Sequence, residues 1–227
     1  KRIKARKTMT EEQIEKAKEI QKLFPDEFEH HPKMGWIPKS WEVSQIGNKL
    51  RILGGGTPST KNREYWEDGI YNFCAPKDFS KISDLILTKT ERKVTEKGLS
   101  KINSGLLKKN TVLMSSRAPI GHLIISNIEL CVNQGIIALE PNGKYNSFYI
   151  YLWVSNNLLK IKSKGNGSTF QEISKSNFRS IEFISPNCSI LKEFKNSSDQ
   201  LFMKILNLTK QNENLKIIRD KLLNYLY

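Results

Sequence analysis

The last 39 residues of the chain, 189–227, contain no proline and no glycine, and leucine recurs in them every seven residues. Four residues after each leucine comes a second member of the same repeat. Two positions per seven residues are typical of a helix that packs lengthwise against another helix. At roughly 1.5 Å per residue such a helix is about 58 Å long, too long for its stripe to be buried only by the globular part of the chain. The sequence therefore predicts a long C-terminal coiled-coil helix over 188–227.

We predict that the two positions of this repeat form a subunit interface. One position is always leucine, whereas the other includes Asn212 and Arg219, polar residues that cost stability but fix the register and the partner. The alternative is a helix that lies on its own domain and needs no partner. The predicted interface residues are Leu201, Ile205, Leu208, Asn212, Leu215, Arg219, Leu222 and Leu226.

The charge of the chain points to a polyanionic partner. Its 227 residues carry 37 Lys and Arg against 23 Asp and Glu, a net charge of +14. A field of that sign attracts polyanions, and nucleic acid is the commonest such partner for an intracellular chain. The alternative is a lysine-rich composition that reflects only an AT-rich coding bias. Charge alone therefore favours nucleic-acid binding without showing how it occurs.

The cysteines and the apolar runs indicate the compartment. Cys74, Cys131 and Cys188 are odd in number and far apart, which argues against a disulfide framework and predicts a reducing, cytoplasmic location. No apolar run approaches the roughly 18–20 residues of a membrane span. The first residues show no apolar signal-peptide core. We therefore expect no membrane partner.

Sequence patterns divide the chain into three parts. Residues 1–40 are a basic segment that contains a helix over about 10–24, opened by a Thr10–Gln13 capping box, and then an extended lead-in. Residues 41–187 form a domain in which strands and helices do not alternate cleanly, so the predicted fold class is α+β. Residues 188–227 are the long helix described above.

Strands in the middle domain are predicted from β-branched runs flanked by Gly, Pro and Asn. A short helix over 95–101 is capped by Thr95, and a longer one covers about 147–163. In the longer helix Phe148, Leu152, Leu159 and Ile161 are expected to face the core. The predicted strands are Val43–Ile46, Arg51–Leu53, Val112–Ser115, His122–Ser126, Leu130–Val132, Ile136–Leu139 and Ser180–Ile184.

No motif in the sequence forms a self-contained reaction centre. The glycine-rich segment 54–59 lacks the Lys-Ser/Thr pair of a phosphate-binding loop, and Pro58 would interrupt the helix that should follow. His30 and His31 would point to opposite faces of a strand, and no two cysteines have metal-ligand spacing. We therefore predict that the chain is not an enzyme by itself and has no metal site.

Three polar segments interrupt apolar runs and are candidates for ligand binding. Arg117 lies in a tight bend between two strands, where it either holds a phosphate or locks the fold through a carboxylate. Asn133 and Gln134 are more typical of internal struts than of residues that read bases. In the segment 163–174, Lys164, Ser168 and Thr169 precede a short helix that a Ser168–Gln171 capping box would open, an arrangement that suits a phosphate oxygen.

Several motifs occur in a fixed order and carry a family resemblance. They are Gly56-Thr57-Pro58-Ser59, Ser116-Arg117-Ala118-x-Ile120-Gly121, Asn133-Gln134-Gly135 and Gly167-Ser168-Thr169, followed by the long helix. Over about residues 34–227 the chain resembles the specificity subunit of type I restriction–modification systems.

The resemblance implies a protein that binds duplex DNA. Such subunits typically have two target-recognition domains separated by two long antiparallel helices, and each domain reads one half of a bipartite site. Methyltransferase subunits that use S-adenosylmethionine to modify adenine N6 dock on this frame, as do restriction subunits that consume ATP with Mg²⁺. No cofactor is expected in this chain itself.

This sequence departs from the family in having one recognition domain. The resemblance leaves two interpretations: the C-terminal half of a longer subunit, or a half-subunit that dimerises. The long helix then pairs with a second spacer helix of the same subunit or with a homodimer partner. The alternative functions are a recognition module of another DNA-modifying or defence assembly, and a standalone DNA-binding coiled-coil protein.

The shared motifs recur in subunits that read different sequences, so the resemblance implies that they build the domain or hold the DNA backbone. Base readout then falls to the segments Lys61–Trp66, Lys77–Lys81 and Thr88–Lys93, which we expect to be loops. The candidate DNA-binding residues are Thr57, Ser59, Arg63, Lys77, Arg92, Lys93, Ser116, Arg117, Lys164, Ser168 and Thr169.

Overall fold

The first described elements are a helix and a hairpin that precede the main domain. The computed structural model describes residues 9–81, 84–117, 119–167 and 171–226. Helix α2 (Glu11–Lys22) begins at Thr10, and both hydrogen bonds of the predicted capping box with Gln13 are present. The extended lead-in is confirmed as extended, and it forms an antiparallel hairpin of β1 (Phe28–His31) and β2 (Gly35–Pro38).

The centre of the molecule is a five-stranded sheet in the order β4-β11-β8-β9-β6. Its pairs are antiparallel except β6 with β9. Strands β8 and β11 are buried for nearly their whole length because their residues are almost all apolar. The strands are β4 (Arg51–Gly54), β11 (Ile136–Glu140), β8 (Val112–Ser115), β9 (Leu123–Ser126) and β6 (Ile86–Leu87).

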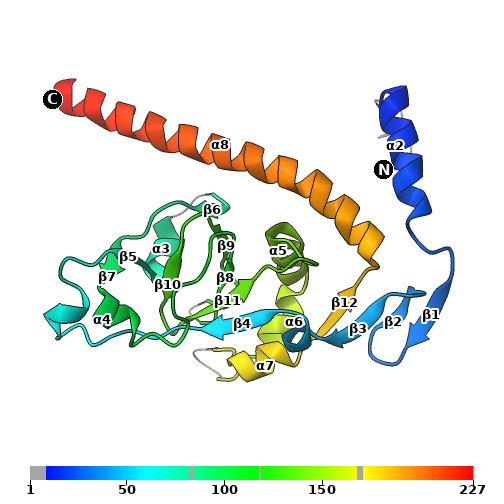
Figure 1. Ribbon diagram of the computed structural model, residues 1–227, viewed down its shortest axis with the longest axis horizontal. Coiled ribbons are helices and arrows are strands. Elements are labelled where there is room, and N and C mark those ends of the chain that lie inside the picture. The colour runs from blue at the N-terminus through cyan, green and yellow to red at the C-terminus, as the bar shows by residue number, and fades with distance from the viewer. Residues whose placement is uncertain (1–8, 82–83, 118, 168–170, 227) are drawn as a thin grey trace.

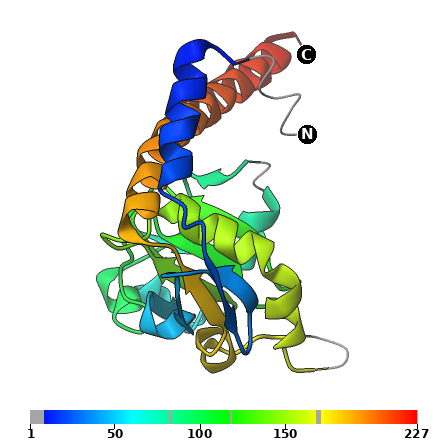
Figure 2. The same ribbon diagram turned by 90° about the vertical axis from the view of Figure 1, so that its right-hand side faces the viewer.

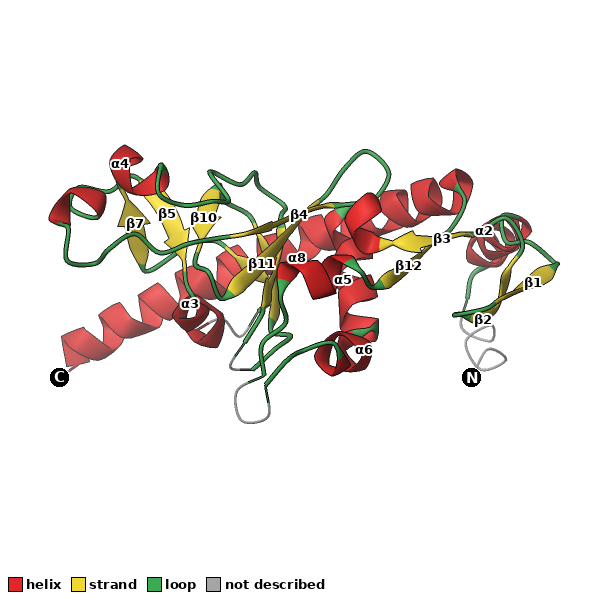
Figure 3. Ribbon diagram, turned by 90° about the horizontal axis from the view of Figure 1, so that it is seen from below, coloured by secondary structure: helices red, strands yellow, loops and turns green. Residues whose placement is uncertain are grey.

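Two smaller sheets flank the central one along the long axis of the molecule (Figure 3). At one end β10 (Leu130–Val132), β5 (Tyr71–Cys74) and β7 (Arg92–Val94) form a three-stranded sheet beside the helices α3 (Pro76–Lys81) and α4 (Glu96–Leu99). The predicted Thr95 cap of α4 is present, since its side chain accepts from the Gly98 amide. At the other end β3 (Glu42–Gln45) pairs with β12 (Glu182–Ser185).

The predicted helix over 147–163 is instead two helices, α5 (Ser147–Asn156) and α6 (Leu158–Ser163). The break falls at Asn157, which has a non-helical backbone and caps the end of α5. Ile161 is fully buried and Phe148 packs against the core, as expected. The core positions predicted for Leu152 and Leu159 are wrong, because these side chains are 41% and 86% exposed.

Helix α8 (Cys188–Leu226) runs as one 39-residue helix along the top of the domain (Figures 1 and 2). One face of it packs on the domain: Leu191 and Leu206 are buried, and the Phe202 ring meets the edge of the Phe148 ring at 5.6 Å. The α+β class with a long C-terminal helix is therefore confirmed. Among the described helices, none combines the length and the apolar character that crossing a membrane requires.

An ion-pair cluster ties α6 and the turn after β1 to strand β12. Lys160 Nζ lies 2.8 Å from one carboxylate oxygen of Glu182, and Lys33 Nζ lies 3.3 Å from the other. The hydrogen bond from Lys160 is the main cause that lowers the pKa of Glu182 from 4.5 to about 2.

This lowered pKa predicts a pH dependence of stability. Because the folded-state pKa lies below the unfolded value, the contribution of Glu182 is complete above pH 4.5 and is lost as the pH falls towards 2. We expect Glu182→Gln to lower the free energy of unfolding at neutral pH and to reduce its decline with acid. Urea unfolding at pH 7 and pH 3 measures both effects, and equal declines in wild type and variant would contradict the prediction.

Candidate nucleic-acid interface

Three of the sequence motifs meet at one edge of the central sheet. Strand β4 ends at Gly54, β8 ends at Ser115 and β11 begins at Ile136, and the register places these three ends side by side. The segments that leave this edge are 55–59, 116–117 and 133–135. We call these three segments the motif edge. The motifs lie far apart in the sequence, and the sheet brings them together.

Side-chain hydrogen bonds connect the first and third segments of the motif edge. Thr57 Oγ1 accepts from Asn133 Nδ2 at 2.5 Å and donates to Gln134 Oε1 at 2.5 Å. Asn133 Oδ1 accepts from the Gly135 amide at 2.8 Å. Asn133 is therefore the internal strut that the sequence favours, while Thr57 and Gln134 are exposed at the surface.

Backbone contacts hold the 55–59 segment so close to the end of β10 that only glycine fits between them. The Gly56 amide donates to the Val132 carbonyl at 3.0 Å. A Cβ atom on the neighbouring Gly55 would lie 1.6 Å from the same Val132 oxygen. The glycines therefore bring the 55–59 segment against the end of β10.

Ser116 and Arg117 have different environments. Ser116 is 3% exposed, and its amide and carbonyl join Gly135 and Ile173 by hydrogen bonds. The Ser116 hydroxyl is buried and has no hydrogen-bond partner among the described residues, so its predicted contact with DNA stays a prediction that this burial does not favour. Arg117 is partly exposed and lies 3.8 Å from the Glu172 carboxylate, so a carboxylate partner of the kind that the sequence offered as one alternative is present, at a half-exposed position.

Unpaired lysines surround the motif edge. Lys164 is exposed and its carbonyl accepts from Asn177 Nδ2 at 3.1 Å. Lys175 begins α7 (Lys175–Arg179), and the aliphatic part of its side chain lies against Gly54. Lys101 is exposed and its carbonyl lies beside Gly56. Within the described part of the chain, none of these three lysines makes an ion pair. The predicted residues Ser168 and Thr169 lie outside the described residues.

A second group of cations adjoins the motif edge through Ser59. The Ser59 carbonyl accepts from Trp66 Nε1 at 3.1 Å, and the Arg92 guanidinium carbon lies 3.5 Å from the centre of the Trp66 ring. Arg63 and Lys93 are exposed nearby, at the start of η2 (Arg63–Tyr65) and on strand β7. We call the exposed residues of both groups the candidate DNA surface; they are Thr57, Ser59, Arg63, Lys77, Arg92, Lys93, Lys101, Arg117, Lys164 and Lys175.

The segment Lys77–Lys81 is not the loop that we expected. It belongs to helix α3, which Asp78 stabilises by accepting from the Ala75 and Glu91 amides. Lys77 remains exposed and pairs with Glu91 at 3.0 Å. Its charge is therefore partly neutralised, which makes it a weaker candidate for DNA contact than the unpaired cations.

Lys101 and Lys175 belong to this surface but are not among the residues predicted from the sequence, and the contact between Trp66 and Arg92 was not predicted either. Lys175 follows Ser174, whose side chain caps α7, so a capping signal was present in the sequence. The Trp66 ring packs against the guanidinium of Arg92, which is 26 residues away on a strand that we did not predict. That contact has no local sequence signal.

Two of the three cysteines, Cys74 and Cys131, are buried and do not supply a reactive thiolate. Burial raises the pKa of Cys131 to about 12 and that of Cys74 well above its usual range, so both thiols stay protonated. Among the described residues, no three His, Cys, Asp or Glu side chains are placed together to hold a metal ion.

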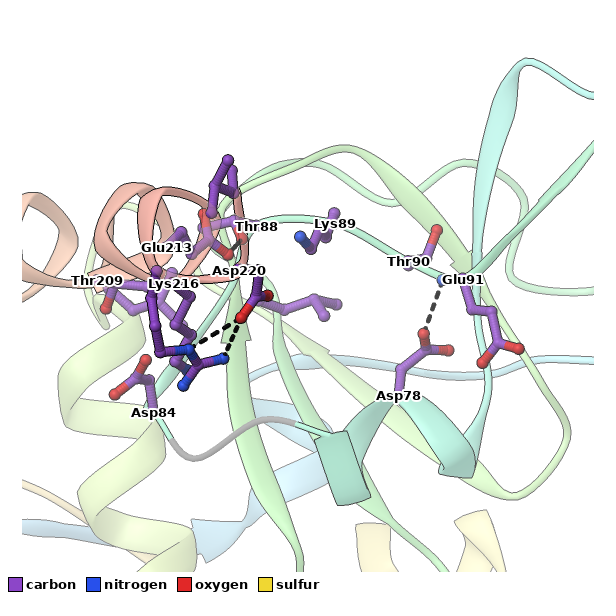
Figure 4. Close-up of a pocket in the computed structure, with 14 residues that line it drawn as sticks. Asp78, Asp84, Thr88, Lys89, Thr90, Glu91, Thr209, Glu213, Lys216 and Asp220 are labelled. Atoms are coloured by element: carbon purple, nitrogen blue, oxygen red, sulfur yellow. Dashed lines mark hydrogen bonds and ion pairs between the residues drawn. The ribbon is translucent and has the colours of Figure 1, made fainter. Parts of the chain in front are cut away.

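A cavity of about 430 Å³ separates the C-terminal half of α8 from the segment that contains β6 (Figure 4). Thr88 Oγ1 donates to Glu213 across one side of it. Its charged lining consists of Asp78, Asp84, Glu91, Glu213 and Asp220 against Lys89, Lys216 and Arg219. With more carboxylates than cations, this cavity is unsuited to nucleic-acid phosphates, and we place the candidate interface at the motif edge instead.

The predicted subunit interface of α8 is mostly exposed. Leu201, Leu208, Leu215 and Leu222 are 49–62% exposed, on a different face from the one that packs on the domain. Ile205 is half-buried, and Asn212 and Arg219 are exposed. The Leu226 side chain lies outside the described residues. The helix therefore both lies along its own domain and keeps an apolar stripe free.

Comparison with known proteins shows which family this chain resembles. Residues 38–222 match a family model described as the type I restriction modification DNA specificity domain. The MjaIX type I restriction enzyme specificity subunit of Methanocaldococcus jannaschii is 33% identical over 187 residues, which cover 82% of this chain and 43% of that protein. The HindI type I restriction enzyme specificity subunit of Haemophilus influenzae is 25% identical, over 82% of this chain and 41% of that protein.

Among solved structures, the HsdS subunit from Thermoanaerobacter tengcongensis has a similar fold. The TM-score is 0.54 at 19% sequence identity, and the match covers 86% of this chain and 45% of that one. The chain thus spans less than half the length of each of these three relatives.

Proposed function

Because this chain belongs to the type I restriction–modification DNA specificity family, we propose that it binds duplex DNA and reads one half of a bipartite site. The observation that carries the proposal is the convergence of three distant motifs at one edge of the central sheet, near three exposed lysines that have no ion-pair partner among the described residues. Backbone amides, hydroxyls and cations of this kind hold phosphates, whereas base edges are read by side chains that reach into a groove.

The chain acts in this proposal as a non-catalytic specificity subunit or half-subunit. It presents DNA to partner methyltransferase subunits, which flip an adenine into their own pocket and methylate its N6 with S-adenosylmethionine. ATP-dependent restriction subunits, which also use Mg²⁺, cleave unmodified DNA. The exposed stripe of α8 supplies the pairing surface for a second spacer helix or for a second copy of this chain.

Selection from a pool of random duplexes tests the proposal. The purified chain is incubated with the pool, and bound duplexes are sequenced. We expect enrichment of one short common half-site. Enrichment of no sequence, or a preference for single strands, would contradict DNA target recognition by this chain.

Lys164→Ala tests the phosphate-holding role of the motif edge. Lys164 is exposed within the 163–174 segment and has no ion-pair partner within the described ranges, so its loss should leave the fold intact. We expect binding to weaken about equally for all duplexes, with a salt slope smaller by about 1. Binding titrations on the selected half-site and on a scrambled duplex measure this; a changed sequence preference would contradict the assignment.

Leu215→Asp tests the pairing stripe of α8. Leu215 is 62% exposed, so a carboxylate there should leave the domain folded but place a charge in the helix–helix seam. We expect loss of self-association or of partner-helix binding in sedimentation experiments, with an unchanged melting temperature. Asn214→Asp is the matched control, since it adds the same charge to an exposed position outside the repeat. Loss of the whole fold would show that the stripe belongs to the core.

A further inference from the structure

The arginines of this chain differ in whether their N–H groups already donate to an acceptor in the protein. Six arginines lie within the described residues, and four of them have an acceptor or carboxylate in the chain. Arg63 and Arg92 have neither within the described part of the chain. The four with partners are Arg51 with Glu140, Arg117 with Glu172, Arg179 with the Ile52 carbonyl, and Arg219 with Asp220.

Arg92 is held in place without using its hydrogen-bond donors. Its guanidinium carbon lies 3.5 Å above the centre of the Trp66 ring, a stacking contact. Stacking uses the face of the guanidinium and leaves its in-plane N–H groups free for a ligand. The flanking Thr90 side chain donates to the Arg92 carbonyl at 2.9 Å and fixes the backbone beside it.

Trp66 is itself rigid, so it gives Arg92 a fixed platform. Its Nε1 donates to the Ser59 carbonyl at 3.1 Å, and its ring meets the buried Phe73 ring edge-on at 5.1 Å. Ser59 is the last residue of the 55–59 segment of the motif edge. The platform is therefore tied to the same surface that we propose holds the DNA backbone.

Among the described residues, no carboxylate forms an ion pair with Arg92, and two acidic residues of this region pair with lysines. Glu64 lies 3.5 Å from Lys97, and Glu91 lies 3.0 Å from Lys77. Strand β7 forms the edge of its sheet, so Arg92 sits at a border with solvent. An exposed, planar and pre-oriented guanidinium with free donors matches the paired acceptors O6 and N7 of guanine in the major groove.

We propose that Arg92 determines sequence preference by donating two hydrogen bonds to a guanine, and that Trp66 is the positioning residue that holds its guanidinium in the reading orientation. This inference rests on the proposed function and adds the residue pair and the base. Arg63, which is exposed but not stacked, contacts phosphates in this scheme.

The test repeats the selection from random duplexes with variants of the full chain. We expect Arg92→Ala and Arg92→Lys to lose discrimination at a single guanine position, by about 5-fold to 150-fold, with the other positions of the half-site unchanged. Arg63→Ala is the matched control and should weaken binding evenly. If Arg92→Ala weakens all duplexes equally and the half-site is unchanged, Arg92 holds phosphate and the proposal is overturned.

The Trp66 variants separate positioning from folding. Trp66→Phe keeps an aromatic platform and should retain the guanine preference, whereas Trp66→Leu should lose it while Arg92 is still present. Melting curves show whether each variant is folded. If Trp66→Leu does not fold, Arg92→Lys still tests whether the guanine preference needs the planar guanidinium, because lysine keeps the charge but lacks the planar pair of donors. A wild-type chain that selects no half-site would instead refute the proposed function itself.

Discussion

The affinity of the chain for duplex DNA is expected to fall about 500-fold between roughly 50 and 200 mM salt. Six cations of the candidate DNA surface have no ion-pair partner within the described residues: Arg63, Arg92, Lys93, Lys101, Lys164 and Lys175. Arg92 is assigned to a guanine, which leaves five cations for phosphates. Each phosphate neutralised releases condensed counterions, so five contacts give a slope of about −4.5 in a plot of log affinity against log salt. Fluorescence anisotropy titrations at several salt concentrations measure this slope.

The same titration separates the proposed function from a purely structural coiled coil. A protein whose α8 stripe pairs with another helix, but which has no nucleic-acid role, would show no such slope. Replacing the five phosphate-contacting cations by glutamine should flatten the plot, and glutamine at the paired lysines Lys39 and Lys144, which lie outside the candidate DNA surface, serves as a control. A change in affinity of less than about tenfold over this salt range would contradict phosphate binding by five residues.

Gly55→Ala is expected to destabilise the fold by about 3 kcal/mol. The new Cβ atom would lie 1.6 Å from the Val132 carbonyl oxygen, and the atoms it meets are backbone, so no flexible side chain can move aside to relieve the clash. The 55–59 segment must then separate from β10, which opens the motif edge. Urea unfolding followed by circular dichroism measures the loss, and DNA titration measures its effect on binding.

Gly143→Ala is the control for this substitution. No heavy atom lies within 4 Å of a Cβ atom built on Gly143, so the same chemical change meets open space. We expect its unfolding curve to match that of the wild type. Equal stability of the Gly55→Ala and Gly143→Ala variants would show that the segment does not pack on β10 as described.

Local patterns predicted the elements whose residues are uniformly apolar or well capped. Strands β8 and β10 have the predicted bounds, and the Thr10 and Thr95 caps are where the sequence places them. Strand β7 was missed because two of its three residues are the cations Arg92 and Lys93, which give no apolar alternation. Its pairing depends on β5 and the tertiary structure around it.

The sequence alone determined the long helix, because a seven-residue repeat without proline or glycine is a local and cooperative signal that no distant contact needs to support. It also determined the charge of the molecule. The tertiary structure decided which motifs share an edge, that Arg117 meets Glu172, and that Arg92 stacks on Trp66. These pairs are separated by tens of residues, and contacts over such distances arise only when the sheets bring their strands together.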